Sequence, residues 1–310
     1  ATAPPPAAHP KARQAASFID TRKLPSWQPR FDAPEPAVAL LVPTLNPTEA
    51  FAGIATAIDI GIGLAARGHR VRMIATDLPV ANHAASRAFI DGRISGTSAT
   101  ETAVRISLYC GVVGDGTGPL ISQHRGDVFL ATAWWTAHVA RSLIAQHAMT
   151  HERFLYLIQD YEPNFYAWGT IFAEAAESYG MDYLPIFNTT LLRDHFVQLG
   201  LCAPDALAFR PSIDVARYSS GARLPRSGPP RLALYGRPEV ERNMFPMAIE
   251  ALEKFLSAKG LGRSDIELFS IGLKHDPVEF STGARLTSLG KLPWEDYPGY
   301  LLSVDIGLSL

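Results

Sequence analysis

Two arginines flank the end of an apolar run in the second half of the sequence. The run LALY is followed by Gly236 and Arg237, and Arg242 comes shortly before a stretch with helical spacing. Guanidinium groups carry forked donors that fit phosphate oxygens, and a helix N-terminus adds a positive dipole end. We therefore predict that Gly236, Arg237 and Arg242 hold an anion. The alternative is that the arginines pair with Glu239 and Glu241 on a solvated surface.

Two carboxylates follow another apolar run, FLYLIQ, in the first half. Asp160 and Glu162 come directly after it. A carboxylate at the end of a buried strand can orient a hydroxyl group or support a developing positive centre. The alternative is structural, with Asp160 capping a turn and Glu162 lying on the surface.

Parallel strands that end at a common edge of a sheet would bring these arginines and carboxylates to a site. The sequence alternates between strand-like and helical patterns, as such a sheet requires. The continuous apolar run at 37–43 predicts a strand buried on both faces of a parallel sheet. Further strand-like runs lie at 71–75, 105–110, 127–132, 154–159 and 183–188. Helical spacing follows Asn46, the expected N-cap with Pro47 and Glu49 behind it, and recurs at 134–148, 171–179 and 191–199. This alternation predicts an α/β fold with a doubly wound parallel sheet.

A second α/β pattern begins after a stretch rich in Gly, Pro and Ser. That stretch, 219–230, reads as a linker, and it is followed by strands at 231–235, 266–272, 285–290 and 305–310 with helices at 245–258 and 294–302. We expect a Pro/Ala-rich arm at 1–36, a Rossmann-like domain at 37–222 and a second one at 223–310. The second domain ends on a strand, so we expect it to be truncated. Facing domains of this kind bind ligands in a cleft at the carboxyl ends of their strands.

Composition excludes several classes of function. The net charge of −2 and pI of about 6.5 disfavour a nucleic-acid partner. The two cysteines form no CxxC pair, and the histidine spacing suits no metal site. No run approaches the ~18 apolar residues of a membrane span, and no signal segment is recognisable, which favours a cytoplasmic protein. Gly61 and Gly63 lie inside a predicted helix rather than in the first turn, so a dinucleotide cofactor is not expected. A P-loop is also absent.

Several ordered motifs resemble the retaining GT-B glycosyltransferases. Tyr235-Gly236-Arg237, Leu289-Gly290-Lys291-Leu292 and Val304-Asp305-Ile306 are similar in order to the F-x-G-R, G-x-(V/L) and (A/V)-D-(I/V) motifs of that family. LAARGHRVRMIATD and RPSIDVARY resemble its L-x-x-R-G-H-x-V and hinge segments. Within the family, YLIQDYEPNFYAWG and YGRPEVERN look most similar to the WsaF-like rhamnosyltransferases of bacterial surface-polysaccharide synthesis.

The resemblance implies transfer of a sugar, expected to be rhamnose, from a nucleoside diphosphate donor such as dTDP-rhamnose. The acceptor would be a saccharide or a lipid-linked saccharide, bound by the 37–222 domain, and the donor would be bound by the 223–310 domain. Neither a cofactor nor a metal is implied, because arginine and a helix N-terminus can stabilise the leaving diphosphate. A peripheral association with the inner face of the membrane stays open.

The resemblance also assigns residues. Arg237 and Arg242 would hold the diphosphate, and Gly290, Lys291 and Leu292 would border the base; Lys291 could instead reach a phosphate. Thr44 and Gly53 would approach donor or acceptor, and Asp160 and Glu162 would be the catalytic candidates. The chain departs from the family at several of these places. Relatives often have Gly-Gly where this chain has Ala52-Gly53, and many have lysine in place of Arg242. The glutamate-bearing helix that grips the donor sugar in relatives would lie after Leu310.

Two other hypotheses remain. One is a nucleotide-sugar epimerase of similar architecture, which would need paired His and acidic residues around the sugar. The other is a non-catalytic saccharide-binding or nucleotide-sugar-binding module, because fold alone does not determine function.

Overall fold

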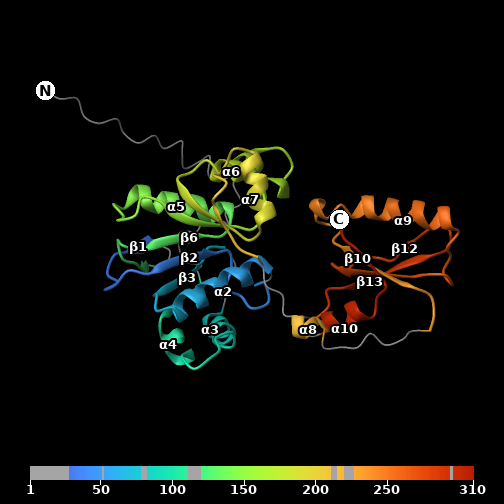
Figure 1. The fold of residues 1–310 in the computed structure, drawn as a ribbon, viewed down its shortest axis with the longest axis horizontal. Helices are drawn as coiled ribbons and strands as arrows, with labels where there is room; N and C mark the ends of the chain where they lie inside the picture. Colours follow the sequence, from blue (N-terminus) through green and yellow to red (C-terminus); the bar gives the residue numbers. More distant parts are fainter. Residues whose placement is uncertain are drawn as a thin grey trace. The chain divides into compact units, whose positions relative to one another are not determined.

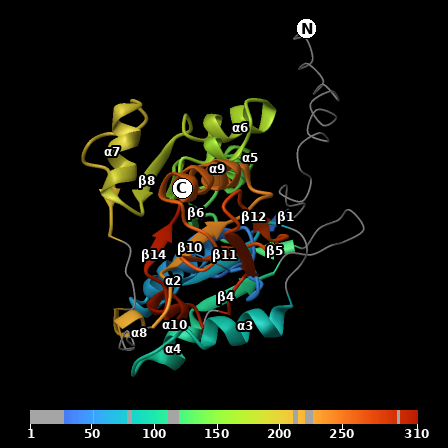
Figure 2. The ribbon, with the colours of Figure 1, turned by 90° about the vertical axis from the view of Figure 1, so that its right-hand side faces the viewer.

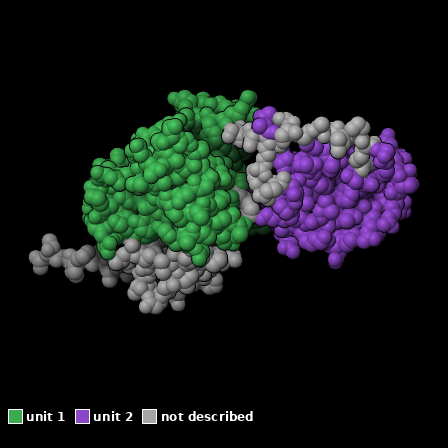
Figure 3. All heavy atoms as spheres, turned by 90° about the horizontal axis from the view of Figure 1, so that it is seen from below, with its two compact units in different colours: residues 1–211 green, residues 212–310 purple. Residues whose placement is uncertain are grey.

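The computed structural model describes residues 28–50, 52–77, 82–110, 120–210, 215–219, 227–293 and 296–310. The chain divides into two compact units, residues 1–211 (unit 1) and 212–310 (unit 2), which are coloured separately in Figure 3. Each unit is an α/β structure with a mainly parallel sheet, so the predicted fold class is confirmed.

Unit 1 is built on a seven-stranded sheet in which every neighbouring pair is parallel (Figure 1). Its strands are β2 (Val38–Val42), β3 (Val71–Ala75), β4 (Ile106–Tyr109), β6 (Val128–Ala131), β7 (Phe154–Ile158), β8 (Tyr183–Phe187) and β9 (Leu207–Ala208). Their spatial order is β4-β3-β2-β6-β7-β8-β9. Counted from β2, this is the Rossmann order 3-2-1-4-5-6 with β9 added at the edge.

Helices cover both faces of this sheet (Figure 1). The helices of unit 1 are α2 (Ala52–Ala66), α3 (His83–Asp91), α4 (Ala99–Val104), α5 (Trp134–Gln146), α6 (Thr170–Ser178) and α7 (Thr190–Gln198), with a 3-10 turn, η3 (Glu162–Phe165). Successive residues of β2 enter opposite cores: Leu41 packs with α5 residues, and Leu40 packs with α2 residues. Burial on both faces explains why β2 is apolar throughout rather than alternating. β3 is likewise buried along its length, and its one charged residue, Arg72, pairs with Asp127 at 2.5 Å.

The first turn of unit 1 differs from the prediction. The helix was expected to begin at Pro47, but α2 begins at Ala52. The Asn46 carbonyl accepts from the N–H groups of Glu49 and Ala50, and the Asn46 side chain accepts from the Thr48 N–H at 3.2 Å. Asn46 therefore stabilises a local turn instead of capping a helix, as Asn side chains commonly do.

Gly61 lies within α2, as predicted, and the structure gives the reason for a glycine there. A Cβ atom at this position would lie 2.7 Å from the Met73 side chain and 3.0 Å from that of Leu40. The glycine thus lets α2 pack closely on β2 and β3, and it does not belong to a phosphate-binding turn.

A small parallel pair of strands lies outside the main sheet. β1 (Gln28–Arg30) pairs with β5 (Leu120–Ser122). Neither strand was predicted, because each has only three residues and no extended apolar pattern. The first lies within the segment 1–36 that was expected to be an arm; residues 1–27 are outside the described residues.

Unit 2 contains a five-stranded sheet in the order β12-β13-β11-β10-β14. Figure 2 labels β14, β10 and β11 side by side in this sheet. Its elements are α8 (Val215–Ser219), β10 (Arg231–Gly236), the 3-10 turn η4 (Glu241–Asn243), α9 (Phe245–Lys259), β11 (Glu267–Gly272), β12 (Val278–Glu279), β13 (Arg285–Gly290), α10 (Tyr297–Leu302) and β14 (Ile306–Leu308). All neighbouring pairs are parallel except β12 with β13. The core contains Leu232 and Leu234 of β10, packed with Phe245, Leu252 and other residues of α9.

The division between the units lies before α8 rather than after residue 222. α8 contacts α10 of unit 2, so this short helix belongs with the second unit. Most of the predicted linker, residues 220–226, is outside the described residues.

Candidate functional site

The candidate anion site of unit 2 lies where the order of strands reverses. Counted from β10, the order β13-β11-β10-β14 reads 3-2-1-4, so the switch point falls between β10 and β14. Ligands of open α/β sheets bind at the carboxyl ends of strands beside such a point. Gly236 ends β10, and Arg237 follows it. The sequence therefore placed Arg237 at the position that the topology favours.

A buried asparagine fixes the backbone at this strand end. Asn243 is 6% exposed, and its side-chain oxygen accepts from the Arg237 N–H at 2.5 Å. Its side-chain N–H donates to the Tyr235 carbonyl at 3.0 Å. Asn243 was not predicted, although an uncharged polar residue just before an apolar helix start is a signal for such a bridge.

Two glycines at neighbouring strand ends position the Arg237 side chain. Gly272 ends β11 with φ of 133°, and a Cβ there would collide with the Gly236 carbonyl and lie 3.2 Å from the Arg237 Cγ. A Cβ on Gly236 would meet the Ser270 hydroxyl and lie 2.9 Å from the Phe245 ring. Internal packing thus requires the glycine at 236, and close approach of a ligand there stays a prediction. Within the described residues, the Arg237 guanidinium makes no hydrogen bond or ion pair.

The other predicted arginine lies in the 3-10 turn before α9. Arg242 is exposed in η4, and α9 begins three residues later at Phe245. The N-cap Met244 has φ of 52°, a left-handed conformation that is strained for a residue with a side chain. Pro246 in the first turn lacks an N–H, so this helix start offers one backbone donor fewer to an anion.

The predicted base-binding residues follow β13 at the same edge of the sheet. Gly290 has φ of 74°, Lys291 is exposed and Leu292 is half-buried. Lys274, which the sequence analysis did not select, lies beside them: its Nζ donates to the Ser288 carbonyl at 2.6 Å. A Cβ on Gly290 would lie 3.4 Å from the Lys274 Cδ. The carboxyl edge of unit 2 therefore carries a set of cations, from β10, η4, β11 and β13.

The switch point of unit 1 lies between β2 and β6, and Thr44 follows β2. The Thr44 side chain is buried, and its oxygen accepts from the Asn46 N–H at 3.0 Å. Gly53 lies at the start of α2, where its carbonyl accepts from the Gln159 side chain at 2.9 Å. Thr44 and Gly53 thus take part in holding the first turn. Ala52, before Gly53, has φ of 30°.

The two candidate carboxylates have different surroundings. Asp160 is exposed, and its side chain accepts from the Tyr161 N–H at 2.8 Å. The Glu162 side chain accepts from the Trp134 N–H at 2.5 Å, which caps the first turn of α5. Burial chiefly, and then the Glu162 charge, raises the pKa of Tyr179 well above its usual value. The structural role considered for Glu162 is therefore present, at a helix start rather than at the surface.

Asp77 is a further carboxylate at this edge that the sequence analysis did not select. It follows β3, its N–H donates to the Pro43 carbonyl at 2.9 Å, and it is therefore adjacent to Thr44. Its side chain accepts from the Trp135 indole at 2.7 Å and from the Thr76 hydroxyl at 2.8 Å. The sequence carried a signal for it, because an aspartate at 77 comes soon after the predicted strand at 71–75.

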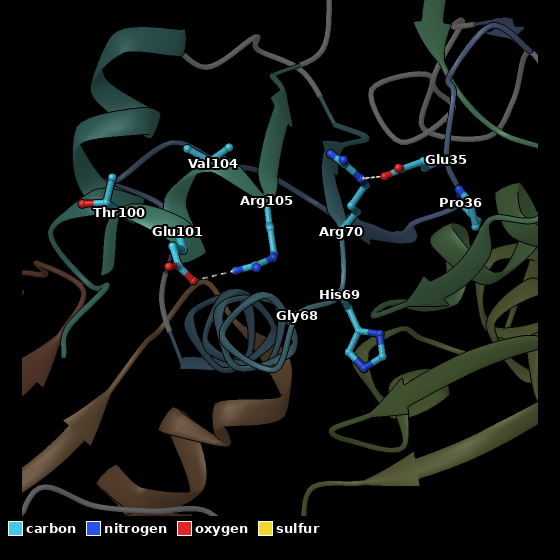
Figure 4. Close-up of a pocket in the computed structure, with 9 residues that line it drawn as sticks. All are labelled: Glu35, Pro36, Gly68, His69, Arg70, Thr100, Glu101, Val104 and Arg105. Carbon is cyan, nitrogen blue, oxygen red and sulfur yellow. Dashed lines mark hydrogen bonds and ion pairs between the residues drawn. The ribbon is translucent and has the colours of Figure 1, made fainter. Parts of the chain in front are cut away.

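A hollow of about 680 Å³ lies elsewhere in unit 1 (Figure 4). It is bordered by Glu35, Pro36, Gly68, His69, Arg70, Thr100, Glu101, Val104 and Arg105. These residues come from α4 and from the segments that precede β2, β3 and β4, so the hollow lies at the amino ends of the strands. Arg70 pairs with Glu35, and Arg105 lies 3.8 Å from Glu101. The hollow is thus distinct from the switch-point residues.

Two other kinds of feature are absent from the described part of the chain. No three His, Cys, Asp or Glu side chains come together there to form a possible metal-ligand set. None of the described helices is both long and apolar enough to cross a membrane.

The fold and these residues define a class: proteins with two Rossmann-like α/β units, each with polar side chains at its switch point. Comparison with protein families makes the assignment specific. Residues 37–190 match the family described as WsaF, N-terminal domain, and residues 230–310 match WsaF, C-terminal domain. The chain carries both domains in order and is a WsaF-like protein.

A curated relative agrees with this assignment. The chain is 36% identical over 182 residues to the O-antigen biosynthesis protein RfbC of Myxococcus xanthus. The match covers 59% of this chain and 13% of the length of RfbC.

Proposed function

We propose that this protein is a glycosyltransferase of bacterial polysaccharide synthesis, which uses a nucleoside diphosphate sugar as donor. The two WsaF domains and the similarity to an O-antigen biosynthesis protein support this class. As the finer proposal, dTDP-rhamnose is the donor, a saccharide or lipid-linked saccharide is the acceptor, and transfer retains the anomeric configuration.

The observation that carries the proposal is the position of Arg237. It follows the first strand of unit 2 at the switch point, with its backbone held by Asn243 and its side-chain stem against Gly272. A preorganised guanidinium stabilises charge that develops on a leaving diphosphate. Arg242 and Lys291 supply further positive charge at this edge, and Gly290 with Leu292 borders the base. This arrangement would replace a metal ion in the reaction.

In the proposed reaction, the bond between the anomeric carbon and the diphosphate oxygen breaks, and the electron pair leaves on the diphosphate. An acceptor hydroxyl oxygen bonds to the anomeric carbon on the same face, and its proton passes to the departing diphosphate. Asp160 is the better candidate to orient that hydroxyl, because Glu162 already caps α5. Thr44 and Gly53 shape the turn that follows β2, and the Gly53 carbonyl accepts from the side chain of Gln159, the residue before Asp160.

Nucleotide binding tests this proposal directly. The melting temperature of the purified protein should rise with dTDP and with dTDP-rhamnose, since a ligand that binds only the folded state stabilises it. Arg237→Ala should abolish this rise, and slow release of free rhamnose from dTDP-rhamnose should be lost with it.

The matched control is Arg263→Ala, which removes an exposed arginine that precedes β11 at the opposite edge of unit 2. It should retain the full rise. An equal rise in wild-type protein and Arg237→Ala would refute the assigned site. Stabilisation by oligosaccharides alone would refute the transferase and indicate a saccharide-binding module.

A further inference from the structure

An exposed tryptophan on the loop from β7 to α6, Trp168, lies against the half-buried Phe172 in the first turn of α6. Trp168 is 89% exposed, and its ring centroid lies 5.0 Å from that of Phe172 at an interplanar angle of 35°. Asp160 lies on the same loop, at the carboxyl edge of the unit 1 sheet. An indole exposed to this extent contributes little to burial of apolar surface, so the fold itself gives no reason for a tryptophan here.

The loop that carries Trp168 is held in place from inside the unit. The Trp134 indole N–H donates to the Tyr166 hydroxyl at 3.0 Å, and Trp134 is only 3% exposed. The 3-10 turn η3 and the bond from the Ala173 N–H to the Gly169 carbonyl fix the segments on either side of Trp168. The exposed ring is therefore preorganised, which lowers the cost of ordering it on a ligand.

Polar residues lie on both sides of Trp168 in the chain. Asn164 and Thr170 are exposed, and within the described residues neither side chain makes a hydrogen bond. Asp160 adds an exposed carboxylate, and no lysine or arginine occurs between 154 and 192. The C–H face of a sugar ring packs well on an aromatic face, and its hydroxyls need acceptors and donors at the rim. An anionic bilayer would instead require basic residues beside the aromatic ones.

We propose that Trp168 and Phe172 form the platform on which a ring of the acceptor saccharide stacks, with Asn164 and Thr170 bonding its hydroxyls. This inference rests on the proposed function and assigns the acceptor subsite to the β7–α6 loop. Trp168 acts in binding and takes no part in the bond changes.

Titration with saccharides tests the platform. The probes are synthetic rhamnose-terminated and hexose-terminated trisaccharides, titrated calorimetrically into wild-type protein, Trp168→Ala, Trp168→Phe and Leu191→Ala. Trp168→Ala should weaken binding of the preferred trisaccharide at least about tenfold, whereas Trp168→Phe should retain most of it. Leu191 is an 80% exposed side chain on α7, so its removal is the matched control and should have little effect.

The dTDP-induced melting shift, measured on the same variants, separates this inference from the proposed function. A normal shift in Trp168→Ala together with lost trisaccharide binding supports the platform. Equal trisaccharide binding by Trp168→Ala and wild type would overturn it, as would a wild-type protein that binds dTDP but none of the trisaccharides. Loss of co-sedimentation with phosphatidylglycerol vesicles in Trp168→Ala, with trisaccharide binding intact, would overturn it in favour of a membrane contact.

Discussion

The side chain of Asn243 bridges the backbone on both sides of Gly236, accepting from the Arg237 N–H and donating to the Tyr235 carbonyl. Asn243→Ala should destabilise the protein by about 1–3 kcal/mol, because two backbone groups lose a partner in a buried setting. Urea unfolding followed by circular dichroism measures the loss. Asn243→Asp keeps the oxygen that accepts from the Arg237 N–H but loses the N–H that donates to the Tyr235 carbonyl. Its stability should therefore lie between those of wild type and Asn243→Ala. An Asn243→Ala variant that is as stable as wild type would show that water replaces the two lost hydrogen bonds.

Gly272 should tolerate no side chain. Gly272→Ala combines strain at φ of 133°, of about 1–3 kcal/mol, with a collision against the Gly236 carbonyl. Gly228 supplies a matched control, because its φ is 132° and a Cβ there would meet nothing within 4 Å. The stability lost by Gly272→Ala beyond that lost by Gly228→Ala therefore measures the collision. Nucleotide affinity should fall only in the Gly272 variant, since Arg237 rests on that glycine. Equal losses in both variants would contradict the close packing.

Ala52→Gly should stabilise unit 1. Ala52 has φ of 30°, and a glycine would remove strain of about 1 kcal/mol, less the entropy that glycine loses on folding. Ala55→Gly, within the regular part of α2, should instead cost about 1 kcal/mol. Thermal unfolding of both variants tests the difference in sign. A loss of stability in both would mean that Ala52 is unstrained in solution.

Glu174 should make stability depend on pH. Burial, and to a smaller extent the Glu177 charge, raises the pKa of Glu174 above its value of 4.5, although His138 opposes the shift. The folded state therefore holds the proton more tightly than the unfolded state, and stability falls as pH rises from the unfolded pKa through the folded one. At neutral pH, Glu174→Gln should be more stable than wild type, and the gain should shrink below pH 4.5.

The control for that effect is Glu152→Gln, which alters an exposed glutamate and should change stability little at any pH. The test is to measure the unfolding free energies of wild type, Glu174→Gln and Glu152→Gln from about pH 4 to 8. A gain for Glu174→Gln that is the same at all pH values would assign the effect to packing rather than to ionisation.

The main architecture follows from the sequence because long apolar runs have few alternatives. The run at 71–75 is a strand with those bounds, and Trp134 begins α5 as predicted. Short elements escaped prediction: β1, β5, β9 and β12 have two or three residues each, and their pairing depends on tertiary contacts rather than on local pattern. The predicted start of α2 was wrong, because Asn46 and Pro47 suit a turn as well as a helix cap.

At the candidate site, the residues that follow strands were predictable and their partners were not. Arg237 and Asp160 could be placed from the sequence, because the chain position after an apolar run identifies a strand end. Asn243 reaches the end of β10 from η4, and Lys274 bonds the Ser288 carbonyl of β13, so only tertiary structure brings these partners together. The two candidate carboxylates also show a limit: Asp160 and Glu162 are close in sequence, yet one is exposed and the other caps α5.

The pairing of β1 with β5 has a practical consequence for dissecting the protein. The family match starts at residue 37, but Gln28–Arg30 already adds a strand to Leu120–Ser122, next to the wholly buried Ile121. An N-terminal deletion to residue 37 would leave the β5 edge open and uncover an apolar side chain. Both invite intermolecular strand addition. Recombinant versions of unit 1 should therefore begin ahead of Gln28.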